Sequence, residues 1–335
     1  MKADISSAPP ACWVVSDGKI GMEVQCLGLA EALGFAPAVK RIQVRRPWRW
    51  LPPLLVPNPL QCLGPKGDRL APPWPRVLIA SGRQTVAVSI AIRQAARGRT
   101  FTVQVQNPAV DPARFDAIVT PRHDRLRGPN VINTVGGLNI VTPARLAAAA
   151  ARFAPRLKAL PRPLIAVALG GDNKVYRMTG KVVERLGAQL AAITRAEGAG
   201  LLITPSRRTS DRALAALRAA LYGLPVKIWD GRGDNPYLAY LALADAIVVT
   251  ADSINMVSEA ASTGKPVFVV ELSGGSKKFR RFHRALRAAG VTREFAGRME
   301  TWNYAPLRDT EHAAAEIRRR LDRHAGRTTL RAPPG

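Results

Sequence analysis

The segment TADSINMVSEAASTGKP, residues 250–266, decides the fold because it joins a buried strand to a capped helix. The apolar run 246–250 predicts the strand, and Ser253 is placed to cap the helix that follows. Gly264 and Pro266 predict the end of that helix. A strand, a polar turn and a helix in this order are typical of a parallel α/β sheet.

The same pattern recurs along the chain in two series of short apolar runs, each followed by a polar loop. The runs are 11–15, 77–80, 101–105 and 117–119 in the first series, and 164–169, 201–204, 226–229, 246–250 and 267–270 in the second. Continuous apolar runs are typical of parallel strands covered on both faces. We therefore predict an α/β protein with two doubly wound, Rossmann-like domains whose strand-end loops face each other across a cleft.

The expected domain boundary lies in a proline-bounded, alanine-rich helix within residues 143–163. It separates an N-terminal domain, 1–160, from a C-terminal domain, 161–325, and 335 residues suffice for two domains. We expect the last amphipathic helix, 311–323, to pack back on the N-terminal domain. The tail 326–335 is predicted to be disordered.

Composition limits the partners and the location. The formal net charge is +26, with 22 basic and 8 acidic residues in 1–160 and 28 and 16 in the remainder. This charge suits nucleic acid, anionic lipid or a phosphorylated ligand, but the absence of any known DNA- or RNA-binding motif disfavours nucleic acid. Three cysteines without metal-site spacing, no apolar stretch of about 18 residues and no signal-like N-terminus predict a cytoplasmic protein, free or peripheral on the inner membrane.

The helix that begins at Ser253 is the first part of a candidate nucleotide site. Backbone N–H groups at a helix N-terminus suit a diphosphate, and Glu259, further along this helix, can accept hydrogen bonds from both hydroxyls of a ribose. The alternative is ordinary helix capping, with Glu259 as an exposed helix residue.

Two further loops of the second series complete the candidate site. Gly170 and Gly171 follow the strand 164–169, while Ser206, Arg207 and Arg208 follow the strand 201–204. Adjacent arginines can neutralise a leaving diphosphate in place of a metal ion, unless they form a solvated basic turn. No cofactor is expected, because a nucleotide-sugar donor would itself be the substrate.

The first series supplies the candidate acceptor side. Gly18 and Gly21 allow the backbone to approach a ligand, Asp17 is a candidate general base and Gln25 a candidate hydrogen-bond donor. A tight strand–helix turn capped by Asp17 is the alternative. His123, just past the strand 117–119, is a second candidate base, although a lone histidine is more often structural. Neither a P-loop nor GxGxxG is present, and histidine spacing predicts no metal site.

Residues 40–60 form a separate feature, with five basic residues, no acidic residue, two tryptophans and a Leu-Leu-Val cluster. Trp48 and Trp50 beside arginines and leucines suit contact with an anionic membrane surface. A proline-rich loop folded onto its own domain is the alternative.

The chain resembles the plant elongated-mitochondria fission-factor family and its bacterial relatives over nearly its full length. The resemblance rests on these motifs: SDGKIGMEVQCLGLAEALG (16–34), LGGDNK (169–174), PSRRTS (205–210), DNPYLAYLALADAIVVTADSINMVSEAASTGKPV (234–267) and RRFHRAL (280–286). Residues 250–266 are also similar to the nucleotide-binding strand–helix unit of glycosyltransferase-B enzymes. That similarity implies a glycosyltransferase-B-like fold, with Ser253 and Ser258 at the donor phosphates and Glu259 at the ribose.

Two functions follow from these expectations. The first is a metal-independent glycosyltransferase that uses a nucleotide sugar or nucleoside diphosphate at the inner face of a membrane, on an acceptor that could be lipid-linked. The second is a non-catalytic adaptor for fission or membrane remodelling that retains the fold without the chemistry.

Overall fold

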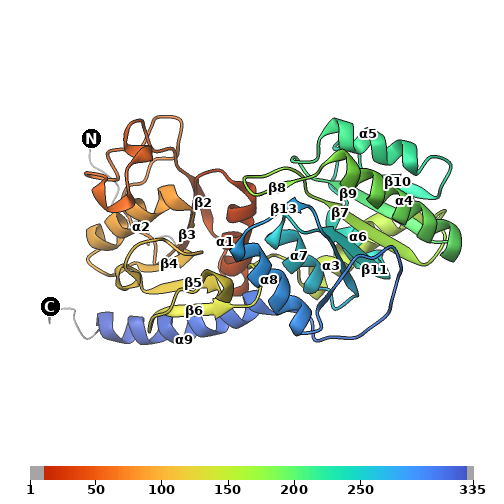
Figure 1. Ribbon diagram of the computed structural model, residues 1–335. Helices are drawn as coiled ribbons and strands as arrows, with labels where there is room; N and C mark the ends of the chain where they lie inside the picture. Colours follow the sequence, from red (N-terminus) through yellow and green to blue (C-terminus); the bar gives the residue numbers. More distant parts are fainter. Residues whose placement is uncertain (1–10, 330–335) are drawn as a thin grey trace. The chain divides into compact units, whose positions relative to one another are not determined.

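A computed structural model describes residues 11–329 and divides the chain into two compact units. The first contains the chain up to Ile140 and again from Asp309, and the second contains Val141–Arg308. Each has a six-stranded, all-parallel sheet with helices on its faces (Figure 1). Within residues 11–329, no helix combines the length and the apolar character that a bilayer span requires.

The first sheet has the strand order β2-β1-β3-β4-β5-β6. Its strands are β1 Cys12–Ser16, β2 Ala38–Arg41, β3 Val77–Ser81, β4 Phe101–Val105, β5 Ala117–Pro121 and β6 Val131–Thr134. Helices α1 (Ile20–Ala32) and α9 (Asp309–Thr329) bury their apolar side chains against one face, and α2 (Arg83–Ala95) covers the other. Helices therefore shield both faces of the sheet from water, which explains why its central strands are rich in apolar residues.

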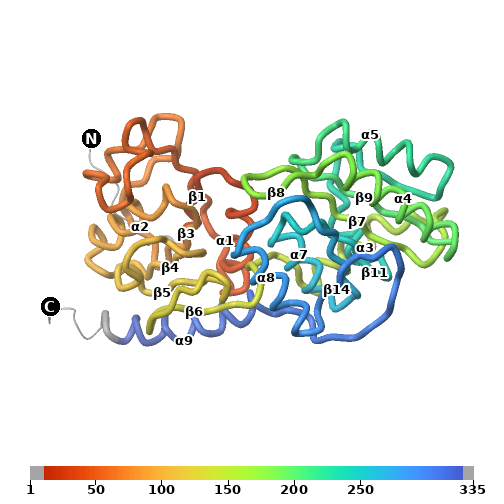
Figure 2. Tube along the Cα trace, viewed as in Figure 1, coloured from red at the N-terminus to blue at the C-terminus, as the bar shows by residue number. Residues whose placement is uncertain are grey.

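The last helix, α9, belongs to the first unit although it comes after the whole second unit in the sequence (Figure 2). The Asp309 carboxylate accepts hydrogen bonds from the backbone N–H groups of Val135 (2.9 Å) and Gly136 (2.7 Å). Farther along, Ile317 and Leu321 are buried in the core of the first sheet. The helix continues to Thr329, beyond the residue 326 at which the tail was expected to begin, and residues 330–335 of that tail lie outside the described part.

The second sheet has the order β10-β9-β7-β11-β12-β14. Its strands are β7 Leu164–Leu169, β9 Gly200–Pro205, β10 Val226–Ile228, β11 Ala246–Thr250, β12 Val267–Val270 and β14 Thr292–Glu294. The helices of this unit are α3 Pro143–Phe153, α4 Gly180–Glu197, α5 Asp211–Ala220, α6 Tyr237–Leu243, α7 Ile254–Ala261 and α8 Lys277–Ala288, and a small ribbon pairs β8 (Tyr176–Arg177) with β13 (Ser273–Gly274).

Helix α3 lies in the second unit and does not form a free connection. It packs against α6, Arg152 pairs with Asp234, and Phe153 and Leu157 are buried. The division between the units therefore falls at residues 140/141 and not at 160/161, because α3 packs against α6 of the second unit.

Candidate functional site

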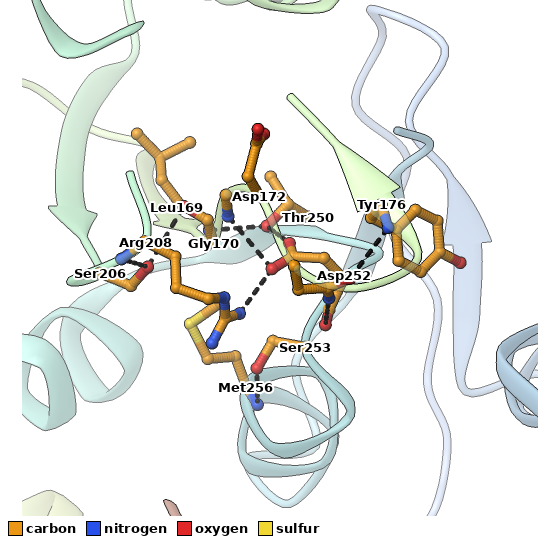
Figure 3. Close-up of polar contacts among 12 residues, drawn as sticks. Leu169, Gly170, Asp172, Tyr176, Ser206, Arg208, Thr250, Asp252, Ser253 and Met256 are labelled. Carbon is orange, nitrogen blue, oxygen red and sulfur yellow. Dashed lines mark hydrogen bonds and ion pairs between the residues drawn. The ribbon is translucent and has the colours of Figure 1, made fainter. Parts of the chain in front are cut away.

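The candidate site in the second unit lies where the order of the parallel strands reverses. From β7 the chain continues outward to β9 and β10, whereas β11 is followed by β12 and β14 on the opposite side. The carboxyl ends of β7 and β11 thus form the topological switch point, which is where open α/β sheets bind their ligands. The loops that follow β7, β9 and β11 meet here (Figure 3).

Asp252 is the centre of this loop cluster. Its side chain is fully buried, and its Oδ1 accepts a hydrogen bond from the Thr250 hydroxyl at 2.7 Å. Its Oδ2 accepts from the Gly171 N–H at 3.1 Å and from the Arg208 guanidinium at 2.5 Å. Since each loop contributes a donor to one carboxylate, Asp252 fixes the three loops relative to one another (Figure 3).

The two glycines after β7 are required by close packing. A Cβ atom on Gly170 would lie 2.1 Å from Oδ1 of Asp252, and one on Gly171 would lie 1.9 Å from the backbone oxygen of Arg208. Glycine is the one residue type that fits such an approach. These glycines allow the loops to pack closely against one another, which is a different role from the predicted contact with a ligand.

The loop after β9 is also tied to β7. The hydroxyls of Ser206 and Thr209 donate to the Gly170 carbonyl, at 3.2 Å and 2.5 Å. Arg208 is held by Asp252, so part of its charge is already neutralised. Arg207 is exposed as well and forms no ion pair with residues 11–329, so its full charge is available to a phosphate.

Helix α7 begins directly after Asp252. The Ser253 hydroxyl accepts from the Met256 N–H at 3.3 Å, which confirms Ser253 as the N-cap. Ser258 is fully buried, and its hydroxyl donates to the Ile254 carbonyl at 2.7 Å. This geometry does not favour the phosphate contact expected for Ser258, because that side chain points into its own helix.

Glu259 is partly buried at the other end of the same helix and is paired with a tyrosine. The Tyr237 hydroxyl donates to its carboxylate at 2.8 Å. Burial raises the pKa of Glu259 to about 7, against an ordinary value of 4.5, and the hydrogen bond from Tyr237 opposes this shift. The carboxyl group therefore titrates close to neutral pH.

We expect Glu259→Gln to change how the stability of the protein depends on pH. The folded state of the wild type binds the Glu259 proton more tightly than the unfolded state, so this stabilisation is complete below pH 4.5 and is lost as pH rises through 7. Glutamine removes that loss, and the variant should gain about 2 kcal/mol relative to the wild type between pH 5 and pH 8. Urea denaturation at four pH values measures the difference; curves that stay parallel would contradict the raised pKa.

The first unit has its own switch point, between β1 and β3. Asp17 lies there, after β1, with its side chain only 1% exposed. Its Oδ2 pairs with Lys19, while Oδ1 is buried and has no hydrogen-bond partner among the described residues. Gly82, after β3, lies opposite, since a Cβ atom there would be 3.4 Å from Oδ2 of Asp17. Asp17 is thus a buried carboxylate with one oxygen that no described residue satisfies.

The other predicted residues of the first unit are distributed more widely. Gly18 has φ +81° with open space around it, Gly21 is exposed, and the Gln25 side chain is buried and accepts from Gln106 at 3.4 Å. His123 is buried in a short turn after β5. Strands β3 and β4 separate β5 from β1, which places His123 about 14 Å from Asp17 at the usual strand spacing. The two candidate bases therefore do not share one site.

Several site residues were not predicted from the sequence. Contacts between loops or helices, which no local pattern reveals, are made by Asp252, Thr250, Thr209 and Tyr237. Lys265 is another: its ammonium group donates to the Leu241 (3.0 Å), Ala242 and Ala244 (2.6 Å) carbonyls and so caps the end of α6, the helix that carries Tyr237.

Comparisons with known proteins agree with this architecture. The model of the family described as mitochondrial fission ELM1 matches residues 20–321. The chain is 36% identical to mitochondrial fission protein ELM1 of Arabidopsis thaliana over 274 residues, which are 74% of the chain and 64% of that protein. It is 26% identical to the uncharacterised protein RP120 of Rickettsia prowazekii (strain Madrid E), over 91% of the chain and 97% of RP120.

A solved structure shares the fold at low sequence identity. UDP-GlcNAc 2-epimerase from Methanocaldococcus jannaschii aligns with a TM-score of 0.51 and 12% identity, over 92% of the chain and 98% of that protein. The glycosyltransferase-B-like α/β fold expected from the sequence is confirmed. The chain spans less than two thirds of the A. thaliana protein.

Proposed function

Because the chain belongs to the mitochondrial fission ELM1 family and has a glycosyltransferase-B-like fold, we propose that it binds a nucleotide sugar and transfers the sugar to an acceptor. The observation that carries the proposal is the convergence of three strand-end loops at the β7–β11 switch point, immediately before α7. The M. jannaschii protein with this fold is named for a UDP-sugar substrate.

The donor diphosphate is assigned to the N-terminus of α7 at Ser253, where the helix dipole and backbone N–H groups favour an anion. The exposed Arg207 then neutralises the leaving diphosphate, while Arg208 is oriented by Asp252. Glu259 accepts the ribose hydroxyls, a role that strengthens as its carboxyl group ionises above pH 7. The cationic side chains serve in place of a metal ion in this mechanism.

In the first unit, Asp17 is proposed as the general base for the acceptor hydroxyl. Its buried Oδ1 lacks a hydrogen-bond partner among the described residues, and a buried acceptor of this kind gains free energy by receiving a hydrogen bond. His123 is less suited, because it lies away from the switch point of its sheet.

A panel of nucleoside diphosphates and nucleotide sugars tests the donor site through the shift in the thermal midpoint. One nucleotide is expected to stabilise the protein by about 2.7 kcal/mol at a hundredfold excess over its Kd. Glu259→Ala should lower that affinity at least tenfold, and Glu197→Ala, an exposed glutamate at the end of α4, should leave it unchanged. If no compound shifted the thermal midpoint of a protein that melts cooperatively, the transferase proposal would be refuted.

The non-catalytic adaptor is the second candidate, and one observation favours it. Two groups expected to bind the donor already have partners within the protein, Glu259 with Tyr237 and Arg208 with Asp252. In an adaptor these pairs would serve stability alone. Substitutions at the switch point would then change stability without changing any nucleotide affinity.

Action at the inner face of a membrane is part of the proposal and rests on the segment 40–60. Trp50, Leu54 and Leu55 are 60%, 48% and 65% exposed. Arg46 lies over the Trp50 ring, 5.4 Å from its centroid. Arg83, after β3, donates to the Trp50 and Leu51 carbonyls at 2.9 Å, so the exposed apolar tip is held in place. Exposed apolar side chains with arginines beside them suit an anionic bilayer surface.

Trp48 differs from its neighbour, since it is partly buried against the core of the first unit. The triple variant Trp50→Ala, Leu54→Ala, Leu55→Ala should therefore reduce co-sedimentation with vesicles containing phosphatidylserine at least tenfold, with its fold intact. Tyr222→Ala removes a still more exposed aromatic residue, which lies in the second unit, and should have no effect. Vesicle binding that survives the triple variant would refute this part of the proposal.

A further inference from the structure

Helix α8 of the second unit carries the most one-sided charge of any helix in the described chain. Its sequence, KKFRRFHRALRA, contains six basic residues and no acidic residue. These are Lys277, Lys278, Arg280, Arg281, Arg284 and Arg287. The motif 280–286 within it has no part in the proposed donor site.

The helix separates its apolar and basic residues onto opposite faces. Phe282, His283 and Leu286 are buried at the spacing of one helical face. Lys277, Arg280, Arg284 and Arg287 recur every three or four residues and are all exposed. We call these four residues the basic stripe; at 1.5 Å per residue it is about 15 Å long.

The charges of the basic stripe destabilise the helix that carries them. Lys277, Lys278 and Arg280 lie in or next to the first turn, where the helix dipole favours acidic residues, and like charges three or four residues apart repel one another. Helices α5 and α9 of the same chain place aspartate in their first turns. When a helix departs from these charge preferences without any gain in stability, the departure indicates a functional role.

Little within the protein compensates this charge. Arg287 lies 3.5 Å from Glu271, while Lys277, Arg280 and Arg284 form no ion pair with any carboxylate of residues 11–329. The most positive part of the stripe also coincides with the positive end of the helix dipole. The surface is therefore built to attract an anionic group.

We propose that the basic stripe is a docking surface for an acidic polypeptide segment whose aspartate and glutamate side chains pair with it. The exposed apolar side chains of α8 are alanines, Ala285 and Ala288, so the stripe lacks the tryptophan and leucine anchors of residues 50–55. A membrane would gain no apolar contact here. Arginine pairs with carboxylates through two parallel hydrogen bonds, which gives a peptide a fixed position on the helix.

The docking surface lies on the helix that supports the switch-point loop. On the opposite face of α8, Nε2 of His283 is 2.8 Å from the Ala251 carbonyl, next to Asp252. The Phe279 ring packs edge-on against Tyr176, 5.0 Å between centroids, in the ribbon that follows Gly171. A partner on the stripe thus binds directly behind the candidate donor loop, although the inference does not depend on the proposed function.

The test uses a fluorescein-labelled 16-residue peptide of alternating glutamate and alanine, titrated with the full chain and followed by fluorescence anisotropy. The variant Lys277→Glu, Arg280→Glu, Arg284→Glu should weaken binding at least tenfold. The control Arg195→Glu, Arg212→Glu, Arg218→Glu changes the net charge equally on exposed positions of α4 and α5 and should weaken it less than twofold. Should the reversed variant fail to fold, the three glutamines at the same positions replace it.

Three results would overturn the proposal. Equal weakening by the stripe variant and the control would mean that the peptide responds to net charge alone. No measurable affinity of the wild type for the peptide at about 0.1 M salt would exclude a docking surface of this kind. Stripe-dependent binding to phosphatidylserine vesicles or to duplex DNA that is tighter than binding to the peptide would assign the surface to lipid or to nucleic acid.

Discussion

Replacing Asp252 with alanine is expected to lower the free energy of unfolding by about 3 kcal/mol and to abolish nucleotide binding. The substitution leaves the Thr250 hydroxyl and the Gly171 N–H without their acceptor in a buried site. Arg208 is 41% exposed along its side chain and can turn to water, which keeps the cost below that of a fully buried ion pair. Urea denaturation and the nucleotide panel measure the two effects.

The controls for this prediction lie in the same cluster. Asp172→Ala removes a carboxylate that is 60% exposed and should cost less than about 1 kcal/mol. The double variant Asp252→Ala, Arg208→Ala should cost less than the sum of the two single variants, because both remove the same ion pair. A loss for Asp252→Ala no greater than that for Asp172→Ala would show that Asp252 does not hold the loops together.

Gly171→Ala should destabilise the second unit by about 3 kcal/mol or more. The new Cβ atom would lie 1.9 Å from the backbone oxygen of Arg208 and 2.3 Å from its carbonyl carbon, so the loop after β9 must move as a whole. A side chain could rotate away from such a clash, but the backbone cannot. Nucleotide affinity should fall with stability, because the same movement breaks the contact between Arg208 and Asp252.

Gly180→Ala is the matched control, since it adds the same methyl group at the first residue of α4. The nearest atom to its Cβ would be Oε1 of Glu184 at 3.9 Å, and alanine is the better helix former. We expect a gain of up to about 0.5 kcal/mol there. Equal losses at positions 171 and 180 would mean that the packing at Gly171 is looser than the structure indicates.

The sequence predicted the central strands of both sheets and missed three of the four outermost strands. Strands β3, β4, β7, β11 and β12 are buried on both faces, and all but β4, which contains Thr102 and Gln104, read as apolar runs. Strands β2, β6 and β14 lie at sheet edges, are only three or four residues long, and each includes half-buried or exposed residues. A pattern this short cannot be told from a loop.

The candidate site was likewise predicted only in part, because the sequence reveals local signals but not contacts between distant segments. Ser253 was identified because an N-cap is a local signal, one residue before a helix. Asp252, beside it, was missed because its partners lie 44 and 81 residues away along the chain. Gly170 and Gly171 were noticed as a pair, but the reason for them, contact with Asp252 and Arg208, depends on the tertiary structure.

The position of α9 has a consequence for the order in which the protein matures on the ribosome. The first unit needs Asp309, Ile317 and Leu321 to close its core, yet the ribosome makes these residues after the entire second unit. Domains usually complete their folding from the N-terminus during synthesis. Here the second unit is complete first, while the part of the first sheet that α9 covers stays exposed until α9 has been made. Chains that terminate before residue 309 therefore expose apolar side chains of the first unit, and we expect chaperones and proteases to recognise them.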